Sequence, residues 1–303
     1  MKKIYIYFLA AALMFFSACS QVNESIYEPV ETTAEEEILP YPVTIGSLVF
    51  NSSPESVVSL SPAITEIIAE LGFSDRISGR SIYCDYPESI SDAAEMGSAA
   101  NPDVDAVIEA APQLLISHSP IAKKDITAIE SAGTRVLIIS APSSVEELYE
   151  LYSSIYRVFN GFDGGEEDAV AEIFSPLEDA FEENSELFES YVYIISGELA
   201  VASDSTFAGD FLSHFGTNSA ADESENAVSE ERLLELDPEY IILSSQVSES
   251  SLPDGLTAVA EGKVIKLDSE TEALLERPTS RVYLAVEAIS GLKNSIDSEQ
   301  SED

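Results

Sequence analysis

The chain contains no tryptophan, only two histidines and two cysteines, and few basic residues. Its 14 lysines and arginines stand against 56 aspartates and glutamates, so the formal net charge is −42 at pH 7. Such a charge repels nucleic-acid phosphates and bare anionic lipid, and we expect no nucleic-acid partner. The acidity is consistent with two interpretations: a solvated surface that keeps the protein soluble, or adaptation to a salty habitat.

What the chain does contain suits a folded protein. Hydrophobic residues make up 45% of its 303 residues, including 13 tyrosines and 13 phenylalanines. This length and composition predict one large domain or two lobes with a full core.

The first residues carry an export signal. A basic MKK is followed by an apolar run, residues 4–16, that is too short to span a bilayer comfortably. The next letters, FSAC, resemble the bacterial lipobox with Cys19 as the lipidated mature N-terminus, although the usual pattern has Leu where Phe16 stands. We therefore predict a lipoprotein signal peptide over 1–18 and a protein anchored outside the cytoplasmic membrane; the alternative is ordinary secretory cleavage.

An acidic tether follows the lipobox. Residues 19–40 carry several glutamates and no Lys or Arg, and they show little periodicity. Lipidation of Cys19 would leave Cys84 as the remaining cysteine, so no intramolecular disulfide is expected. We interpret Cys84 as an inert, half-buried thiol, with a ligand role as the alternative.

Strand and helix patterns alternate in two regions, which predicts an α/β protein with a central parallel sheet in each of two lobes. The N-terminal lobe is predicted over 41–142 and the C-terminal lobe over 190–295, with a disordered tail over 296–303. In the first region we predict a hairpin (42–50), strands (56–60, 76–80, 114–117, 135–140) and helices (62–72, 104–111, 121–133). In the second we predict strands (191–196, 240–244, 264–268) and helices (206–216, 229–237, 280–292).

The intervening segment, 143–189, has a helical pattern without strands. Ser144 and the glutamate three positions later form a capping box, and that helix should stop at Asn160. A second helix is predicted from about Glu166 to Glu186. Pro176 lies inside it and should either kink it or mark the junction of two shorter helices.

One pattern occurs in both lobes. Each copy has a capping residue, a first-turn acid two positions later, a second acid, a proline and then an apolar strand. These positions are Asp103, Asp105, Glu109 and Pro112 in one lobe and Ser229, Glu231, Glu235 and Pro238 in the other. The pattern is how a short helix enters a parallel strand, but two copies also suit docking on a two-fold partner that has a basic residue on each half.

Five segments resemble, in order, the periplasmic binding proteins that serve ABC importers of cobalamin, ferric siderophores and haem. They are VVSLSPAITEIIAELGFSDRISGRSIYCDYPESI, NPDVDAVIEAAPQLLIS, STFAGDFLSHFG, ERLLELDPEYIILS and LLERPTSRVYLAVEAI. The resemblance covers about residues 42–292. It implies two Rossmann-like lobes joined by one long helix, and a monomer that carries a metal chelate rather than a cofactor. It also implies that Asp105 and Glu231 dock on arginines of the permease dimer, although Asp105 departs from the usual Glu.

Candidate ligand contacts lie in loops that follow the strands, because ligands of open α/β sheets bind beyond the strands' carboxyl ends. The predicted ligand-binding residues are Ser61, Arg80, Tyr83, Tyr86, His118, Phe207 and Arg277. By the resemblance, Tyr83 is the better match of the two tyrosines, and Phe207 and Arg277 face the cleft. Arg80 either meets an anionic chelate or pairs with an acid, and His118 either touches the ligand, ligates its metal or is an ordinary polar residue. Arg281 is expected to anchor the last helix.

Three other functions are alternatives to the import of a metal chelate. A receptor for free zinc or manganese needs several converging His or carboxylate ligands, and His118 and His214 are a poor supply. A chelatase-like enzyme shares the lobe topology, but no Ser/His/Asp order, HExxH or phosphate-binding glycine loop is present. A surface adhesin would not need the two docking acids. The absence of tryptophan also weakens a specific assignment to cobalamin, whose binders often use it.

Overall fold

The computed structural model describes residues 40–300. The predicted export signal, Cys19 and nearly all of the acidic tether therefore lie outside the described residues. None of the helices within 40–300 combines the length and the apolar character needed to cross a membrane.

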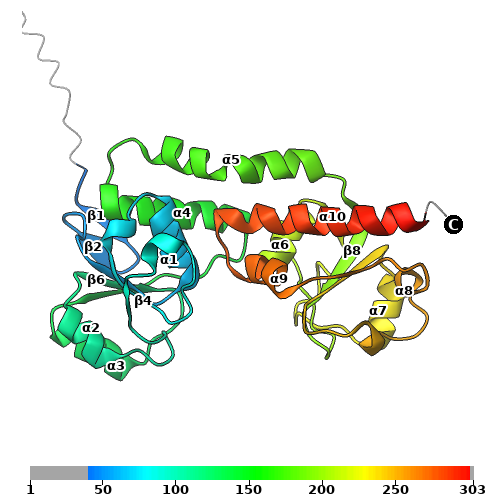
Figure 1. Ribbon diagram of the computed structural model, residues 1–303, viewed down its shortest axis with the longest axis horizontal. Coiled ribbons are helices and arrows are strands. Elements are labelled where there is room, and N and C mark those ends of the chain that lie inside the picture. The colour runs from blue at the N-terminus through cyan, green and yellow to red at the C-terminus, as the bar shows by residue number, and fades with distance from the viewer. Residues whose placement is uncertain (1–39, 301–303) are drawn as a thin grey trace, which may run out of the picture. The chain divides into compact units, whose positions relative to one another are not determined.

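The N-terminal lobe is a five-stranded, fully parallel sheet in the order β5-β4-β3-β6-β7 (Figure 1). Its strands are β3 (Val57–Ser59), β4 (Ile77–Arg80), β5 (Ala94–Glu95), β6 (Leu114–Ser117) and β7 (Arg135–Ile138). Its helices are α1 (Pro62–Glu70), α2 (Val104–Ala110) and α3 (Lys123–Ser131). The predicted hairpin precedes them as the antiparallel pair β1 (Val43–Ile45) and β2 (Leu48–Phe50).

The C-terminal lobe repeats this plan with four parallel strands in the order β11-β10-β8-β9. Its strands are β8 (Phe188–Ile194), β9 (Gly216–Asn218), β10 (Tyr240–Leu243) and β11 (Val264–Lys266). Its helices are α6 (Phe207–Ser213), α7 (Glu230–Leu236), α8 (Thr257–Ala260), α9 (Ser269–Glu276) and α10 (Tyr283–Gln300), the last entered through a 3₁₀ turn, η4 (Ser280–Val282). The predicted fold class, two lobes with parallel sheets joined by a long helix, is confirmed.

Two helices without strands link the lobes, α4 (Val145–Asn160) and α5 (Glu166–Asn184). The Ser144 hydroxyl caps α4 by accepting from the Glu147 N–H at 3.1 Å, and the Ser143 N–H donates to the Glu147 carboxylate at 2.7 Å. Figure 1 shows α5 running alongside α4 and α10, and α5 packs against both of these helices. Val170, Phe174, Leu177 and Ala180 form its buried face.

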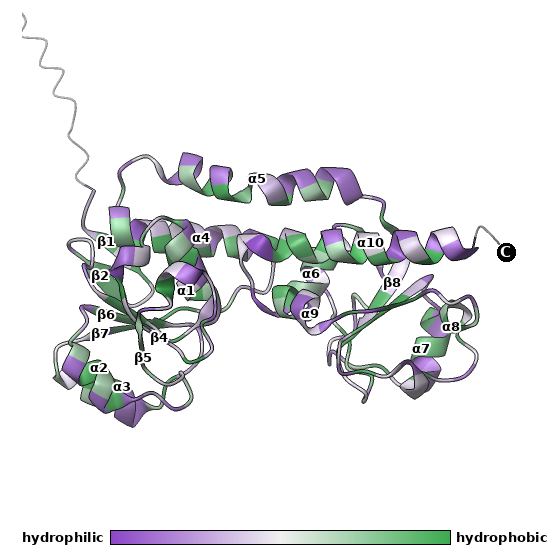
Figure 2. Ribbon diagram, viewed as in Figure 1, coloured by the Kyte–Doolittle hydropathy of each residue, from purple (hydrophilic) through white to green (hydrophobic). Residues whose placement is uncertain are grey.

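Both sheets are covered on both faces, as near-continuous apolar parallel strands require. One face of each sheet joins a large core shared with α1, α4, α5, α6 and α10. The other face of the N-terminal sheet is covered by Val107 of α2 and Ile129 of α3, and that of the C-terminal sheet by Leu233 of α7 and Ala258 of α8. Figure 2 shows the strands coloured as mostly hydrophobic and the outer helices as mixed.

Three sequence expectations need correction. Pro176 does not divide α5 into two shorter helices, because it lies on the exposed side, where water can satisfy the carbonyl whose hydrogen bond is lost, while Phe174 and Leu177 pack inside. The expected tail, 296–303, is helical as far as Gln300. There Tyr240 donates to Asp297, which also pairs with Lys293 at 2.6 Å, so the last turns of α10 are held down. The segment Ser269–Glu276, for which no helix was predicted, forms α9, which Asp268 caps by accepting from the Thr271 N–H at 2.8 Å.

Candidate ligand cleft and docking helices

Three neighbouring strands of the N-terminal sheet, β4, β3 and β6, end beside one another and bring three predicted site residues to one edge. Arg80 ends β4, Ser61 follows β3, and His118 comes directly after β6. In each, one buried polar atom finds no hydrogen-bond partner within residues 40–300: Arg80 Nε, Ser61 Oγ and His118 Nδ1. This edge of the sheet therefore carries polar side chains with hydrogen-bonding capacity that a ligand could use.

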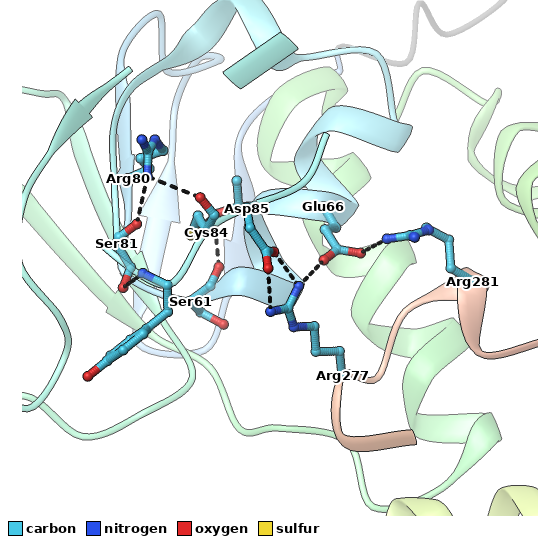
Figure 3. A network of polar contacts seen from close by, with 10 residues as sticks. Ser61, Glu66, Arg80, Ser81, Cys84, Asp85, Arg277 and Arg281 are labelled. Atoms are coloured by element: carbon cyan, nitrogen blue, oxygen red, sulfur yellow. Dashed lines mark hydrogen bonds and ion pairs between the residues drawn. The ribbon is translucent and has the colours of Figure 1, made fainter. Parts of the chain in front are cut away.

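Arg80 is engaged by the protein itself. Its Nη1 donates to the Ser81 carbonyl at 3.3 Å and to the Cys84 carbonyl at 3.0 Å, and its Nη2 lies 3.3 Å from Glu95 Oε1 (Figure 3). Its side chain is 14% exposed. Of the two roles left open for Arg80, pairing with an acid is the one observed, and the guanidinium braces the loop that follows β4.

Ser61 and His118 are also withdrawn from solvent. Ser61 is buried as the N-cap residue of α1, where its carbonyl accepts from the Thr65 N–H at 3.0 Å and from the Thr65 hydroxyl at 2.8 Å. His118 is half-buried, and this burial lowers the pKa of its imidazole below the usual value. The ring is therefore neutral at pH 7.

The loop after β4, residues 81–87, carries both predicted tyrosines. Tyr83 is 63% exposed and its ring is open to solvent, whereas Tyr86 is 40% exposed with the Arg281 guanidinium 3.6 Å from its ring centroid. Tyr86 is thus occupied by a cation–π contact. Tyr83 is thus the more exposed of the two tyrosines.

Four charged residues join the lobes beneath this loop (Figure 3). Glu66 of α1 accepts from Arg277 Nη1 at 3.2 Å through Oε1 and from Arg281 Nη1 at 3.0 Å through Oε2. Asp85 of the loop meets Arg277 with both oxygens, at 2.5 Å from Nη1 and 3.1 Å from Nη2. The Arg277 cluster, defined as Glu66, Asp85, Arg277 and Arg281, therefore ties the N-terminal lobe to the segment between α9 and α10.

The two acids of the Arg277 cluster differ in environment. The Glu66 side chain is 2% exposed, and burial raises the pKa of its carboxyl although both arginines act in the opposite direction. The Asp85 side chain is 67% exposed, and hydrogen bonding from Arg277 lowers the pKa of its carboxyl. Both arginines are about three-quarters buried, with 28% and 26% of their side chains exposed.

A second set of polar contacts lies one helical turn further along α1. Glu70 accepts from the Tyr152 hydroxyl and, at 3.0 Å, from the Ser280 hydroxyl, while the Ser280 N–H donates to the Tyr152 oxygen at 2.8 Å. Burial raises the pKa of the Glu70 carboxyl. These contacts fix η4, and with it Arg281, against α1 and α4. Arg281 therefore anchors the start of the last helix, as the sequence indicated.

A cleft of about 680 Å³ opens beside the Arg277 cluster. Glu66, Asp85 and Tyr86 line it from the N-terminal lobe, and residues of α9, η4 and α10 line it from the C-terminal lobe. This volume falls within the range of small-molecule sites. Of the predicted ligand-binding residues, Tyr86 and Arg277 line this cleft, whereas Ser61, Arg80, Tyr83 and His118 do not.

Phe207 does not line this cleft. It is the first residue of α6, is 8% exposed, and packs parallel to Phe211 with ring centroids 6.3 Å apart in the shared core. The reason is the helix that it begins: Thr206 caps α6 by accepting from the Gly209 N–H at 3.1 Å, and this sets the apolar face of the helix toward β9 and the core. In this structure Phe207 is a core residue.

The docking helices, α2 and α7, match position by position. The Asp103 carboxylate accepts from the Ala106 N–H at 3.0 Å, and the Ser229 hydroxyl accepts from the Arg232 N–H at 3.1 Å. Both helices end at a residue in the left-handed conformation, Ala111 or Asp237, just before the proline.

Asp105 and Glu231 each lie exposed in the first turn of their helix. Hydrogen bonds from its own N–H and from Ser229 lower the pKa of the Glu231 carboxyl, which keeps it ionised. Both predicted docking acids thus face solvent at equivalent positions.

Two members of the Arg277 cluster, Glu66 and Asp85, are not among the site residues predicted from the sequence. Glu66 lies in the middle of an apolar helix stretch, AITEIIAEL, where a single acid at a buried position signals a buried partner. Its partners are 211 and 215 positions away. Asp85 lies between the predicted ligand contacts Tyr83 and Tyr86, and no local sequence pattern distinguishes it from the chain's many other acids.

Two parallel-sheet lobes that share a cleft define a bilobal ligand-binding protein. Comparison with known families agrees: residues 57–271 match the family described as periplasmic binding protein, and the chain belongs to that family. It is a family of binding proteins and not of enzymes, which confirms the expectation on that point.

Similar proteins fall in the same class. The chain is 25% identical over 281 residues to YvrC, an ABC transporter substrate-binding lipoprotein of Bacillus subtilis strain 168, covering 86% of this chain and 88% of the relative. It is 24% identical over 273 residues to a cobalamin-binding protein of Halobacterium salinarum, covering 82% and 71%. A Staphylococcus epidermidis structure described as a possible iron-binding (periplasmic solute-binding) protein superposes with a TM-score of 0.66 at 20% identity, covering 80% and 99%, which shows a shared fold.

Proposed function

We propose that the protein is the substrate-binding lipoprotein of an ABC importer, which captures a metal chelate between its lobes and delivers it to a membrane permease. The observation that carries the proposal is the pair of matched docking helices, because each lobe presents one exposed first-turn acid at the same position. A permease dimer with a basic residue on each half would meet both acids at once.

The ligand proposed for the cleft is a ferric siderophore, a corrinoid or haem. Arg277 offers a cation and Tyr86 an aromatic ring at the cleft, and Tyr83 is an exposed ring on the same loop as Tyr86, so a ligand with both a flat or apolar surface and anionic groups fits them. The Halobacterium relative is named for cobalamin, but its pairing with this chain is distant at 24% identity.

The proposed location is outside the cytoplasmic membrane, with a lipid on Cys19 as the anchor. The support is the apolar run that ends in FSAC, together with the naming of the Bacillus relative as a lipoprotein. Nothing in the described residues favours the alternative of a zinc or manganese receptor, because no group of three or more His, Cys, Asp or Glu side chains within 40–300 is arranged to hold a metal ion.

The first test of the proposal is calorimetric titration of the soluble protein, residues 20–303, with cyanocobalamin, haemin and ferric siderophores of several chemical types. One-to-one binding of at least one chelate is expected. Binding of free zinc or manganese alone would overturn the chelate proposal.

The second test removes the docking acids. Asp105→Ala combined with Glu231→Ala should abolish binding to the permease in nanodiscs and leave chelate affinity unchanged, because close charge pairs across interfaces couple by about 1.5–7 kcal/mol each. The matched control is Glu109→Ala combined with Glu235→Ala, which removes the same charge from the same helices outside the first turn. Permease binding that survives the first double substitution would refute the docking assignment.

A further inference from the structure

The Arg277 cluster has balanced charge only while Asp85 is part of it. Its two arginines carry two positive charges, and Glu66 and Asp85 supply the two negative ones. If Asp85 left, the cluster would hold one uncompensated positive charge at the wall of the cleft. An anion from elsewhere would then be strongly favoured at that place.

Of the two acids, Asp85 is the exchangeable one. Glu66 is 2% exposed within α1 and is shared by both arginines, so its loss would leave buried positive charge without a partner. Asp85 is 67% exposed, belongs to a loop, and contacts Arg277 alone among the arginines. Because the Asp85 side of the pair is exposed, its carboxylate can return to water when it leaves Arg277, and a ligand carboxylate can take over the same two hydrogen bonds.

The geometry at Arg277 defines the group that would replace Asp85. Both carboxylate oxygens of Asp85 face the two terminal nitrogens of the guanidinium, at 2.5 Å and 3.1 Å. This two-pronged pairing matches a planar carboxylate and not an amide or a single hydroxyl. Figure 3 shows the Arg277 side chain reaching from the C-terminal lobe to Asp85 on one side and Glu66 on the other.

We propose that Asp85 is an internal stand-in for a ligand carboxylate: it occupies Arg277 in the empty protein and gives way when a chelate bearing a free carboxylate enters the cleft. The cleft then selects carboxylate-bearing chelates, and Asp85 sets how strongly they must compete. This inference rests on the proposed function, since it names the chemical class of chelate that the same cleft takes.

The test compares paired probes of the same general type, of which one bears free carboxylate and the other bears none. Cyanocobalamin and its monocarboxylic acid, in which one side-chain amide is hydrolysed, form one pair. Haemin and its dimethyl ester form a second, and the ferric complex of a citrate-type siderophore and ferrichrome form a third. The three pairs distinguish a corrinoid, a porphyrin and a siderophore as the source of the carboxylate.

Asp85→Asn should tighten binding of the carboxylate-bearing probe by roughly three- to tenfold, because the internal competitor loses its charge. The carboxylate-free partner of the same pair should change by less than about twofold. Asp85→Ser repeats the test without a side-chain amide near Arg277. The matched control is Glu88→Gln, which changes an exposed acid three positions along the chain; the ion pairs of Arg277 are with Glu66 and Asp85, so this control should leave both affinities unchanged.

The outcomes separate the two proposals. If no chelate binds to the wild-type protein or to any variant, the proposed function is wrong and this inference falls with it. If chelates bind but Asp85→Asn changes neither member of a pair, or both equally, the inference alone is overturned. Arg277→Gln removes the guanidinium that would bind the ligand carboxylate. This variant should therefore lose the preference for the carboxylate-bearing probe.

Discussion

His118 places a neutral imidazole at the edge of the N-terminal sheet, with Nδ1 buried and without a partner within residues 40–300. A histidine that ligates a metal almost always donates its other ring N–H to a carboxylate, carbonyl or water, which fixes the ring. No carboxylate or carbonyl within residues 40–300 accepts a hydrogen bond from Nδ1. We therefore expect His118 to offer a hydrogen bond through Nε2 and not to ligate the metal of the chelate.

The lowered pKa of His118 gives a test through stability. The unfolded chain takes up a proton near pH 6.5 and the folded protein does so only at lower pH, so the unfolded state binds more protons between these values. The stabilisation is complete above pH 6.5 and is lost as the pH falls through the folded-state pKa. We expect the unfolding free energy of the wild type minus that of His118→Gln, measured in urea, to decrease as the pH is lowered from about 8 to about 5. A difference that stays constant over that range would contradict the burial of the ring.

Single residues were predicted from sequence only where their position along an element was informative. The end of a strand indicated Arg80 and His118, but whether Arg80 was free or paired depended on Glu95, which no local pattern connects to it. The Arg277 cluster joins positions about 200 residues apart, so its ion pairs follow from the packing of two lobes and not from any spacing.

At the scale of elements, the most regular feature is the repeated unit of cap, short helix, left-handed residue, proline and strand. Capping residues and the proline fixed the limits of α2 and α7 in advance to within a residue or two. The short elements β9, α8 and α9 went unpredicted, because three to eight residues carry too little periodicity to be recognised.

The left-handed ending of α2 is open to a stability test. Ala111 has φ 44° and ψ 52°, is exposed, and has a Cβ that makes this conformation unfavourable. Ala111→Gly should therefore raise the unfolding free energy by about 1 kcal/mol in urea denaturation. Asp237 is a poorer choice in α7, since its carboxylate also binds Thr257.

Ala110→Gly, one position earlier in regular helix, is the control, and it should lower the unfolding free energy by about 1 kcal/mol. Equal effects of the two substitutions would show that Ala111 is not strained.

For the whole molecule, the sequence predicted two lobes because strand and helix patterns stop and restart around a long helical segment. What the sequence could not predict is how the lobes share one core through α4, α5 and α10, since this depends on faces of helices that meet only in the folded protein. The charge is also a property of the whole: with 56 acids and 14 bases, repulsion acts on every part of the surface.

Salt should therefore stabilise the protein. Raising sodium chloride from about 0.01 M to about 1 M shortens the Debye length from about 30 Å to about 3 Å, which weakens repulsion between like charges. We expect the midpoint of thermal unfolding to rise over this range, most steeply at its low end. Potassium chloride should give the same curve, because screening depends on ionic strength. A flat or falling curve would mean that surface repulsion does not limit stability.

Cys84 allows the rate of opening of the loop of residues 81–87, which carries Asp85 of the Arg277 cluster, to be measured. Its thiol is 4% exposed and lies 3.1 Å from the Thr65 hydroxyl, and burial raises its pKa, so a thiol reagent can reach it only while the loop is lifted. The Cys84 carbonyl accepts from Arg80, and the next residue is Asp85. The rate at which the reagent labels the thiol therefore reports how often this loop opens, and the measurement needs no introduced cysteine.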